Sequence, residues 1–221
     1  MNRAVQGGAA AGLAVLIAVG AWTLGASSGD DDAPATTTTT GPPIAVDGEL
    51  DEGASELGGL LANGRSGTWH ATYAVTPPGA AADEGEELEV WRSGARVRED
   101  SVVGSGAEAV HTVGIRDGDR NVRCQRRGSA PWACAPIEAG ELAQGDLLAA
   151  LVGELAGQTV TPRDDTVGGE PARCFAIGAT DLGEMCVSAE GIPLRIARGG
   201  ATIELVHLER AVDDSVFQPP A

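Results

Sequence analysis

The chain has 221 residues and a formal charge of −17, the difference between 15 basic and 32 acidic side chains, and every basic side chain is arginine. Because non-specific affinity for nucleic acid comes from basic side chains that release counterions, so acidic a surface excludes DNA and RNA as partners. The 32 glycines and only seven aromatic residues favour a protein of strands and turns over one packed around bulky side chains.

The N-terminal segment contains no charged residue between positions 4 and 29. A helix of about 20 residues crosses the hydrocarbon layer of a membrane, so residues 1–29 are predicted to form a retained transmembrane anchor. A cleaved signal peptide is the alternative, because Gly25, Ala26 and Ser27 have the small side chains that signal peptidase accepts. Arg3 precedes the segment and three aspartates follow it. The N-terminus is therefore expected in the cytoplasm and the folded domain outside it, or secreted if the segment is cleaved.

A Thr- and Pro-rich stretch, residues 30–43, follows the N-terminal segment and holds five successive threonines at positions 36–40. It lacks the apolar side chains needed to offset the entropy lost on ordering, so it is predicted to be a disordered linker. Threonine runs beside proline also resemble O-glycosylated stalks, and an unmodified solvated linker is the alternative.

The first predicted helix begins the domain at residues 44–221, which carries a charge of 14 minus 29, or −15. Asp47 is expected to cap this helix, and Asn63 with Gly64 is expected to end it. Its apolar residues recur at helical spacing. They are Leu50, Ala54, Leu57 and Leu61.

Strands are predicted wherever apolar and polar residues alternate between turn signals. The first is Thr68–Thr76, which Pro77 and Pro78 end. The others are expected at Glu87–Arg92, Ala95–Val103, Glu108–Arg116, Asn121–Arg127, Pro131–Ile137, Ala172–Gly178, Glu184–Glu190, Ile192–Arg198 and Ala201–Glu209. A second amphipathic helix, between Asp146 and Gly157, separates the two groups of strands.

The four cysteines form two sequence-local pairs, Cys124 with Cys134 and Cys174 with Cys186. In an exported chain this arrangement predicts two disulfides. Of the three possible connectivities we favour the local one, because each pair flanks turn-forming residues. The nine- and eleven-residue gaps do not match the ligand spacing of zinc fingers or ribbons, so neither a metal nor another cofactor is expected.

These elements define an α+β domain. We expect a strongly curved antiparallel sheet, a half-barrel of about ten strands, covered by two amphipathic helices and preceded by the transmembrane helix. Since few large side chains are available to fill the interior, sheet and helices are predicted to enclose a cavity, and a solid core of aliphatic side chains is the alternative. The candidates for lining the cavity are Leu57, Leu61, Trp69, Tyr73, Val90, Leu148, Leu151, Leu155 and Phe175.

Two short stretches carry a resemblance to a known family. The run Glu190–Arg195, with Gly191, Ile192 and Pro193, and the ending Asp213–Pro220, with Phe217, resemble the LolA-like lipoprotein-carrier superfamily. Its members include the periplasmic lipoprotein chaperone and mycobacterial lipid-carrying lipoproteins. The resemblance implies an incomplete barrel that holds acyl chains or another apolar ligand. This chain departs from the family in its two cysteine pairs and in lacking a lipobox cysteine. The predicted anchor and the disulfides suggest an actinobacterial type of relative outside the cell membrane.

Five arginines within twelve positions form a local positive cluster on one predicted hairpin: Arg116, Arg120, Arg123, Arg126 and Arg127. Because guanidinium pairs bidentately with phosphate, Arg123, Arg126 and Arg127 are candidates for docking to anionic headgroups or to a partner. The alternative is a solvated hairpin whose arginines pair with the glutamates at 84, 86, 87 and 89.

Other residues with reactive side chains are given structural roles. His70, His111 and His207 fall on separate predicted strands without a metal-ligand spacing, so each is expected to be satisfied locally. Asp117 and Gly118 are predicted to form a hairpin turn rather than a calcium loop. Ser105 lacks the strand-to-helix elbow of a nucleophile. No catalytic arrangement emerges, and we expect no enzymatic activity.

The sequence therefore predicts an extracytoplasmic, membrane-tethered protein that carries or senses a lipid or another hydrophobic ligand. The mechanism would be burial of acyl chains between sheet and helices, with displacement of a helix to open the cavity. The rival hypothesis is a regulatory or protein-interaction module of the same fold with a filled core.

Overall fold

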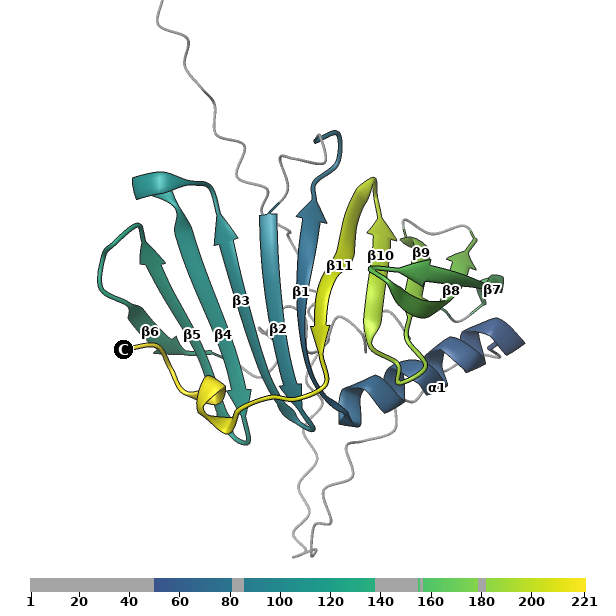
Figure 1. The fold of residues 1–221 in the computed structure, drawn as a ribbon, viewed down its shortest axis with the longest axis horizontal. Coiled ribbons are helices and arrows are strands. Elements are labelled where there is room, and N and C mark those ends of the chain that lie inside the picture. Colours follow the sequence, from purple (N-terminus) through teal and green to yellow (C-terminus); the bar gives the residue numbers. More distant parts are fainter. Residues whose placement is uncertain (1–49, 81–85, 138–154, 156, 179–181) are drawn as a thin grey trace, which may run out of the picture. The chain divides into compact units, whose positions relative to one another are not determined.

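The computed structural model describes residues 50–80, 86–137, 155, 157–178 and 182–221 (Figure 1). The chain divides into two units, residues 1–41 and 42–221, and every described residue belongs to the second unit. The predicted transmembrane segment, the linker and most of the second helix, including Leu148 and Leu151, lie outside the described residues. Among the described helices, none has the length and apolar character needed to cross a membrane.

Eleven strands form one antiparallel sheet in the order β6-β5-β4-β3-β2-β1-β11-β10-β9-β8-β7 (Figure 1). The first six are β1 (Thr68–Thr76), β2 (Glu86–Ser93), β3 (Arg96–Val103), β4 (Val110–Asp117), β5 (Arg120–Arg127) and β6 (Ala133–Pro136). The other five are β7 (Val160–Val167), β8 (Glu170–Ile177), β9 (Leu182–Val187), β10 (Pro193–Arg198) and β11 (Ala201–Glu209). The expected curved antiparallel sheet is confirmed, with eleven strands instead of about ten.

The sheet consists of two meanders joined at its middle. Strands β1 to β6 run outward in sequence order to one edge, and β7 to β11 run inward from the other edge. The join is the pairing of β1 with β11, in which Ala71 lies opposite Leu208 and Tyr73 opposite Leu205. The buried hydroxyl of Tyr73 also donates a hydrogen bond of 2.9 Å to the carbonyl oxygen of Pro193 in β10.

Strand β7 is the element that the sequence pattern missed. Its middle, from Arg163 to Thr166, is polar or charged on both faces, so the alternation that predicts a strand is absent. Proline and charged residues are typical of edge strands, where a missing N–H breaks no central hydrogen-bond ladder and charge discourages pairing with another chain. Strand β7 is one edge of this sheet and pairs only with β8 among the described strands.

Helix α1 (Glu52–Ser66) begins one turn later than the sequence predicts, because Asp51 rather than Asp47 is its N-cap. One carboxylate oxygen of Asp51, Oδ1, accepts a hydrogen bond from Ala54 N at 2.7 Å. The other, Oδ2, accepts one from Val160 N at 2.8 Å. A single carboxylate therefore satisfies the start of the helix and the start of β7.

The helix packs on the sheet through glycines that bring backbone against backbone. A Cβ atom on Gly53 would overlap the carbonyl oxygen of Val160, and one on Gly64 would overlap that of Gly191. Gly191 has a φ of +81° and itself lies so close to the Leu60 carbonyl that a side chain has no room. Gly64 therefore lies inside the helix as a contact point, and the expected helix stop at Asn63 and Gly64 is wrong.

Side chains from the sheet satisfy the carbonyl groups that the last turn of α1 leaves without helical partners. Trp69 Nε1 donates to the Gly64 carbonyl oxygen at 3.0 Å, and Arg92 Nη1 donates to the Arg65 carbonyl oxygen at 3.2 Å. Burial lowers the pKa of Arg92 to about 10, which leaves the guanidinium charged at neutral pH. The end of α1 is thus held by hydrogen bonds to β1 and β2.

Two hydrophobic clusters make up most of the core. The first lies between α1 and the second meander and comprises Ala54, Leu57, Leu61, Leu155, Val160, Phe175, Ile177, Met185, Val187 and Ile196. The second joins the two meanders and comprises Trp69, Ala71, Tyr73, Leu88, Val90, Val97, Val167, Ala172, Cys174, Cys186, Ile192, Leu194 and Leu205. The helix therefore covers only part of the sheet directly.

The C-terminal ending packs against the first meander through the short helix η4 (Asp214–Phe217). Asp213 caps it by accepting a hydrogen bond from Ser215 N at 2.8 Å. Phe217 is buried, and the Arg96 guanidinium lies 4.7 Å from the centre of its ring. Arg98 and Arg120 donate to the carbonyl oxygens of Val216 and Phe217 at 2.7 and 2.9 Å. The ending is thus part of the folded domain.

Both predicted disulfides are confirmed. Cys124 of β5 is bonded to Cys134 of β6, and Cys174 of β8 is bonded to Cys186 of β9. In each case the two cysteines are direct register partners on adjacent strands, as local pairing across a turn requires.

The first prediction concerns the glycine contact of α1. Gly64→Ala should lower the free energy of unfolding by about 1–3 kcal/mol, because the new methyl group overlaps the Gly191 carbonyl. Gly59→Ala is the matched control: nothing lies within 4 Å of its Cβ position, so the better helix propensity of alanine should raise stability by about 0.5–1 kcal/mol. Urea unfolding measures the free energy of unfolding of both variants. An increase in stability in Gly64→Ala would contradict the close backbone contact between Gly64 and Gly191.

The second prediction concerns acid stability. The hydrogen bonds from Val160 and Ala54 lower the pKa of Asp51 below its ordinary value of 3.8. A depressed carboxyl pKa stabilises the fold above the unfolded-state pKa, and this contribution is lost as the pH falls through the folded-state value. Asp51→Asn should therefore unfold more easily than the wild type at pH 7, and the gap should narrow below about pH 4. Urea unfolding midpoints of both proteins, measured from pH 7 to below about pH 4, test this prediction. A difference in stability between wild type and variant that stays constant with pH would contradict it. Asp119→Asn, at an exposed turn, is the control for removing one charge.

Candidate functional site

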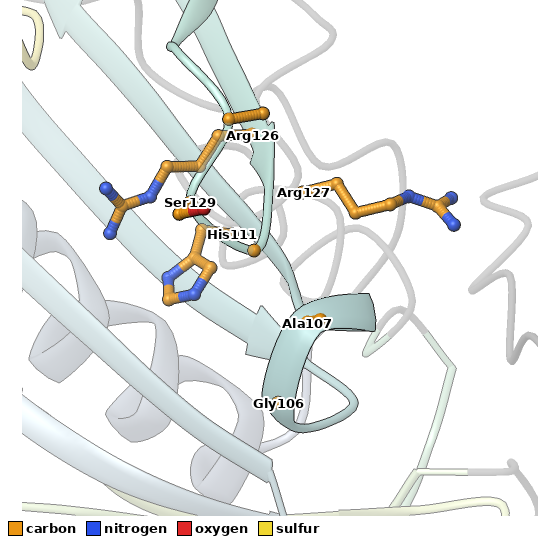
Figure 2. Close-up of a pocket in the computed structure, with 8 residues that line it drawn as sticks. Gly106, Ala107, His111, Arg126, Arg127 and Ser129 are labelled. Carbon is orange, nitrogen blue, oxygen red and sulfur yellow. The ribbon is translucent and has the colours of Figure 1, made fainter.

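A polar pocket of about 730 Å³ lies at one end of β4 and β5, where the short helix η2 (Gly106–Glu108) meets the turn after β5 (Figure 2). It is open to solvent and has a partly cationic lining. The residues that line it are Gly106, Ala107, His111, Arg126, Arg127, Gly128, Ser129 and Ala130.

The β4–β5 hairpin positions the two main side chains of the pocket. Its tight turn is formed by Gly118, which has a φ of +62°, and Asp119, one residue later than predicted, because Asp117 ends β4 and pairs with Arg120. The register that follows from the turn places His111 directly opposite Arg126. Because register partners share a face of the sheet, both side chains lie on the same side of the hairpin, as Figure 2 shows.

Trp132 supports these two side chains. The Arg126 guanidinium lies 4.6 Å from the centre of the indole ring, in the geometry of a cation–π contact. The His111 ring meets the same indole edge-on, with ring centres 6.5 Å apart. The indole therefore holds a guanidinium and an imidazole side by side at the pocket.

Glycine brings the walls of the pocket close together. Gly128 has a φ of +53°, and a Cβ there would lie 2.6 Å from the carbonyl oxygen of Ala107. Its N–H donates a hydrogen bond of 2.8 Å to the carbonyl oxygen of Ala109. The loop around η2 and the turn after β5 are thus fixed to each other by backbone contacts that a side chain would break.

The arginines of the pocket differ in their electrostatic environment. Arg127 pairs with Glu108 at 3.0 Å, but these side chains are 66% and 81% exposed, and such pairs contribute little. Within the described part of the chain, Arg126 is paired with no carboxylate, and its Nε is buried without a hydrogen-bond acceptor. Arg126 therefore carries the charge in the pocket that no described carboxylate balances, which makes it the candidate for contact with an anion.

The five clustered arginines do not form one continuous patch. Arg126 and Arg127 point to opposite sides of β5 (Figure 2), and Arg123 lies opposite Gly114, on the other face of the hairpin from His111. Arg120 pairs with Asp117 at 2.9 Å. The printed sequence alone suggested one docking surface for Arg123, Arg126 and Arg127, whereas the structure brings only the last two to the pocket.

The described candidates for cavity lining are all buried, and they divide between the two core clusters. Leu57, Leu61, Leu155 and Phe175 lie in the cluster under α1, and Trp69, Tyr73 and Val90 lie in the cluster between the meanders. None of these seven side chains is more than 5% exposed. Their role in lining a ligand cavity stays a prediction.

Two of the three histidines share a partner. His70 of β1 and His207 of β11 contact opposite oxygens of Glu209, at 3.5 and 3.2 Å, and His70 also stacks on Trp91 with ring centres 4.6 Å apart. Their strands are neighbours, which the spacing in the sequence did not reveal. Among the described residues, one group of possible metal ligands comes together, Cys174, Glu184 and Cys186, and its two cysteines form a disulfide.

Sequence reasoning missed most of the pocket. Arg126 was singled out for its charge, but the support from Trp132 and the contact at Gly128 depend on how three segments meet. The signal in the sequence was the short spacing from Cys124 to Cys134, since a disulfide across this turn holds Trp132 near β5.

Comparison with known proteins gives a limited result. No protein-family description and no curated protein matches the sequence. Among solved structures, MucB in complex with MucA(peri) is similar, with a TM-score of 0.48 and 20% identity over 76% of this chain and 60% of that chain. An uncharacterized conserved protein from Thermus thermophilus gives a TM-score of 0.46 and 13% identity over 76% and 94%. This chain thus spans less than two thirds of the MucB chain.

The third prediction concerns the disulfide beside the pocket. The double variant Cys124→Ala/Cys134→Ala should lose about 2–3 kcal/mol of stability and show faster amide exchange in residues 128–134, because edge strand β6 is no longer tied to β5. Cys174→Ala/Cys186→Ala is the matched control, since it removes a loop of similar size elsewhere. It should lose similar stability and leave exchange in residues 128–134 unchanged. Unchanged exchange there in the first variant would contradict the prediction.

Proposed function

We propose that this chain is a non-enzymatic binding module of the LolA-like type. It is tethered outside the cytoplasm by its N-terminal segment and engages a partner protein through its surface. The observation that carries the proposal is the burial of the seven described cavity candidates, which are at most 5% exposed. A cavity wide enough for an acyl chain leaves its wall accessible to water-sized molecules, whereas a filled core does not.

The two core clusters support a filled interior. Phe175, Leu57 and Leu61 are at most 1% exposed and pack with Met185 and Val187, so helix and sheet meet directly. The backbone contact of Gly64 with Gly191 leaves no space for a ligand between α1 and that turn. Recognition is then left to the surface, where the pocket beside β5 lies open.

The two disulfides support a location outside the cytoplasm. Disulfides persist in oxidising compartments and are rare in the reducing cytoplasm. Each pair joins adjacent strands, and no described cysteine is free. This agrees with the orientation that Arg3 and the three aspartates after the N-terminal segment predict.

Carriage of a lipid or another hydrophobic ligand is the second candidate, and the cluster under α1 favours it. Separation of the helix from the sheet would uncover the apolar side chains of Phe175, Met185 and Val187 as one surface. In this alternative the filled state is the closed, unloaded form. It requires the glycine contacts of α1 to break when the ligand enters.

The fourth prediction separates these candidates. In a filled core, Phe175→Ala should cost about 3–5 kcal/mol and Leu61→Ala about 2–5 kcal/mol, because each leaves a cavity. Val103→Ala, at a side chain that is 46% exposed, is the control and should change stability by less than about 0.5 kcal/mol.

Native mass spectrometry of the full chain, extracted from its own membranes, provides the second measurement. The proposal expects the mass of the chain with two disulfides and no bound lipid. Losses below about 1 kcal/mol at Phe175 and Leu61, together with a lipid that co-purifies at a fixed ratio, would contradict it and establish carriage instead.

A further inference from the structure

We propose that the pocket beside β5 binds a carboxylate side chain of an acidic peptide segment in the partner protein, with Arg126 as the principal contact. This inference rests on the proposed function and names the chemistry of the partner. It begins from a mismatch of charge: the domain has a charge of −15, but this pocket presents guanidinium and imidazole groups, and no carboxylate among the described residues pairs with Arg126.

The guanidinium of Arg126 can pair with a planar anion. Its carbon lies 4.6 Å from the centre of the Trp132 indole, a contact that holds the side chain beside the pocket. Its Nε is buried and lacks an acceptor among the described residues, so a ligand from solvent would bind the terminal Nη1 and Nη2 groups instead. A carboxylate accepts two parallel hydrogen bonds from these two groups.

His111 and the backbone walls complete the pocket. His111 lies opposite Arg126 in the register, on the same side of the hairpin. Its imidazole ring adds a further group that can form a hydrogen bond with the ligand. The contact between Gly128 and Ala107 fixes the walls before any ligand arrives, so little ordering is needed on binding. The pocket is therefore preorganised for a polar group.

One observation favours a peptide over a lipid surface. A bilayer contacts a broad face of a protein, but Arg126 and Arg127 point to opposite sides and Arg123 lies on the other face of β5. A single carboxylate that enters the pocket needs to contact Arg126 alone.

The pocket can also take atoms that flank the carboxylate. Its volume of about 730 Å³ exceeds that of one carboxylate, so it has room for neighbouring peptide atoms. The expected ligand is a short acidic segment of the partner protein.

The fifth prediction uses the full chain in detergent micelles and a fluorescent peptide of sequence Gly-Leu-Glu-Glu-Leu-Gly. Fluorescence anisotropy should detect binding, and replacing both Glu by Gln in the peptide should weaken it at least about tenfold. Arg126→Gln should weaken binding of the Glu peptide by a similar factor, and Arg126→Lys by less, since lysine keeps the charge but not the fork of donors. Arg123→Gln, on the same strand but the opposite face, should stay within about twofold of the wild type.

Three results would overturn the inference. The first is no binding of the Glu peptide or equal binding of the Glu and Gln peptides, a comparison that requires no change in the protein and so does not depend on the folding of a variant. The second is an equal loss in Arg123→Gln and Arg126→Gln. The third is binding of inorganic phosphate or phosphatidylglycerol vesicles in preference to the peptide. None of these results alters the core measurements on Phe175 and Leu61, so the inference and the proposed function can fail separately.

Discussion

The architecture depends on a close contact between backbones, where α1 lies against the starts of β7 and β10. Gly53 and Gly64 on the helix, and Gly191 on the sheet side, have no side chain, and the neighbouring carbonyl groups occupy the space that a Cβ would need. The contact brings Leu57 and Leu61 into the cluster around Phe175. Because the helix precedes β1 and packs against the second meander, the same contact also ties the two meanders together.

The two ends of the sheet have different physical characters. Around β7 to β10, buried aliphatic and aromatic side chains pack under the helix, and the edge strand β7 is protected by proline and charge. Around β4 to β6, the buried cluster of Val113, Ile115 and Cys124 is small, and an open pocket with cationic side chains lies beside it. The main core and the proposed binding pocket therefore lie at opposite ends of the sheet, so substitutions in the pocket can be tested without removing the main core.

Local signals in the sequence predicted most of the sheet, both disulfides and the turn at Gly118, because alternation and turn residues act within a few positions. The sequence did not predict β7, because proline and charged residues such as those around Pro162 are typical of an edge strand and lack the alternation of other strands. That β7 is an edge becomes known only from the strand order of the whole sheet. The sequence did not predict the pocket, and of its lining it singled out only Arg126 and Arg127 as docking candidates, for their charge. The contact of Arg126 with Trp132 depends on how separate segments meet in the fold, and a periodic pattern in the sequence cannot reveal such contacts. Likewise, Gly64 has the local pattern of a helix end and is kept inside the helix by a tertiary contact.

The hydrogen bond from Val160 to Asp51 has a consequence for biogenesis. These residues are 109 positions apart, and the glycine contact between residues 64 and 191 spans a still longer stretch. During synthesis, residues 51–66 emerge well before the strands on which they pack. Until β7 to β10 follow, the apolar stripe of this segment has no native surface to cover it. A chaperone that shields the early segment should therefore raise the yield of folded protein more than one that acts on the late strands.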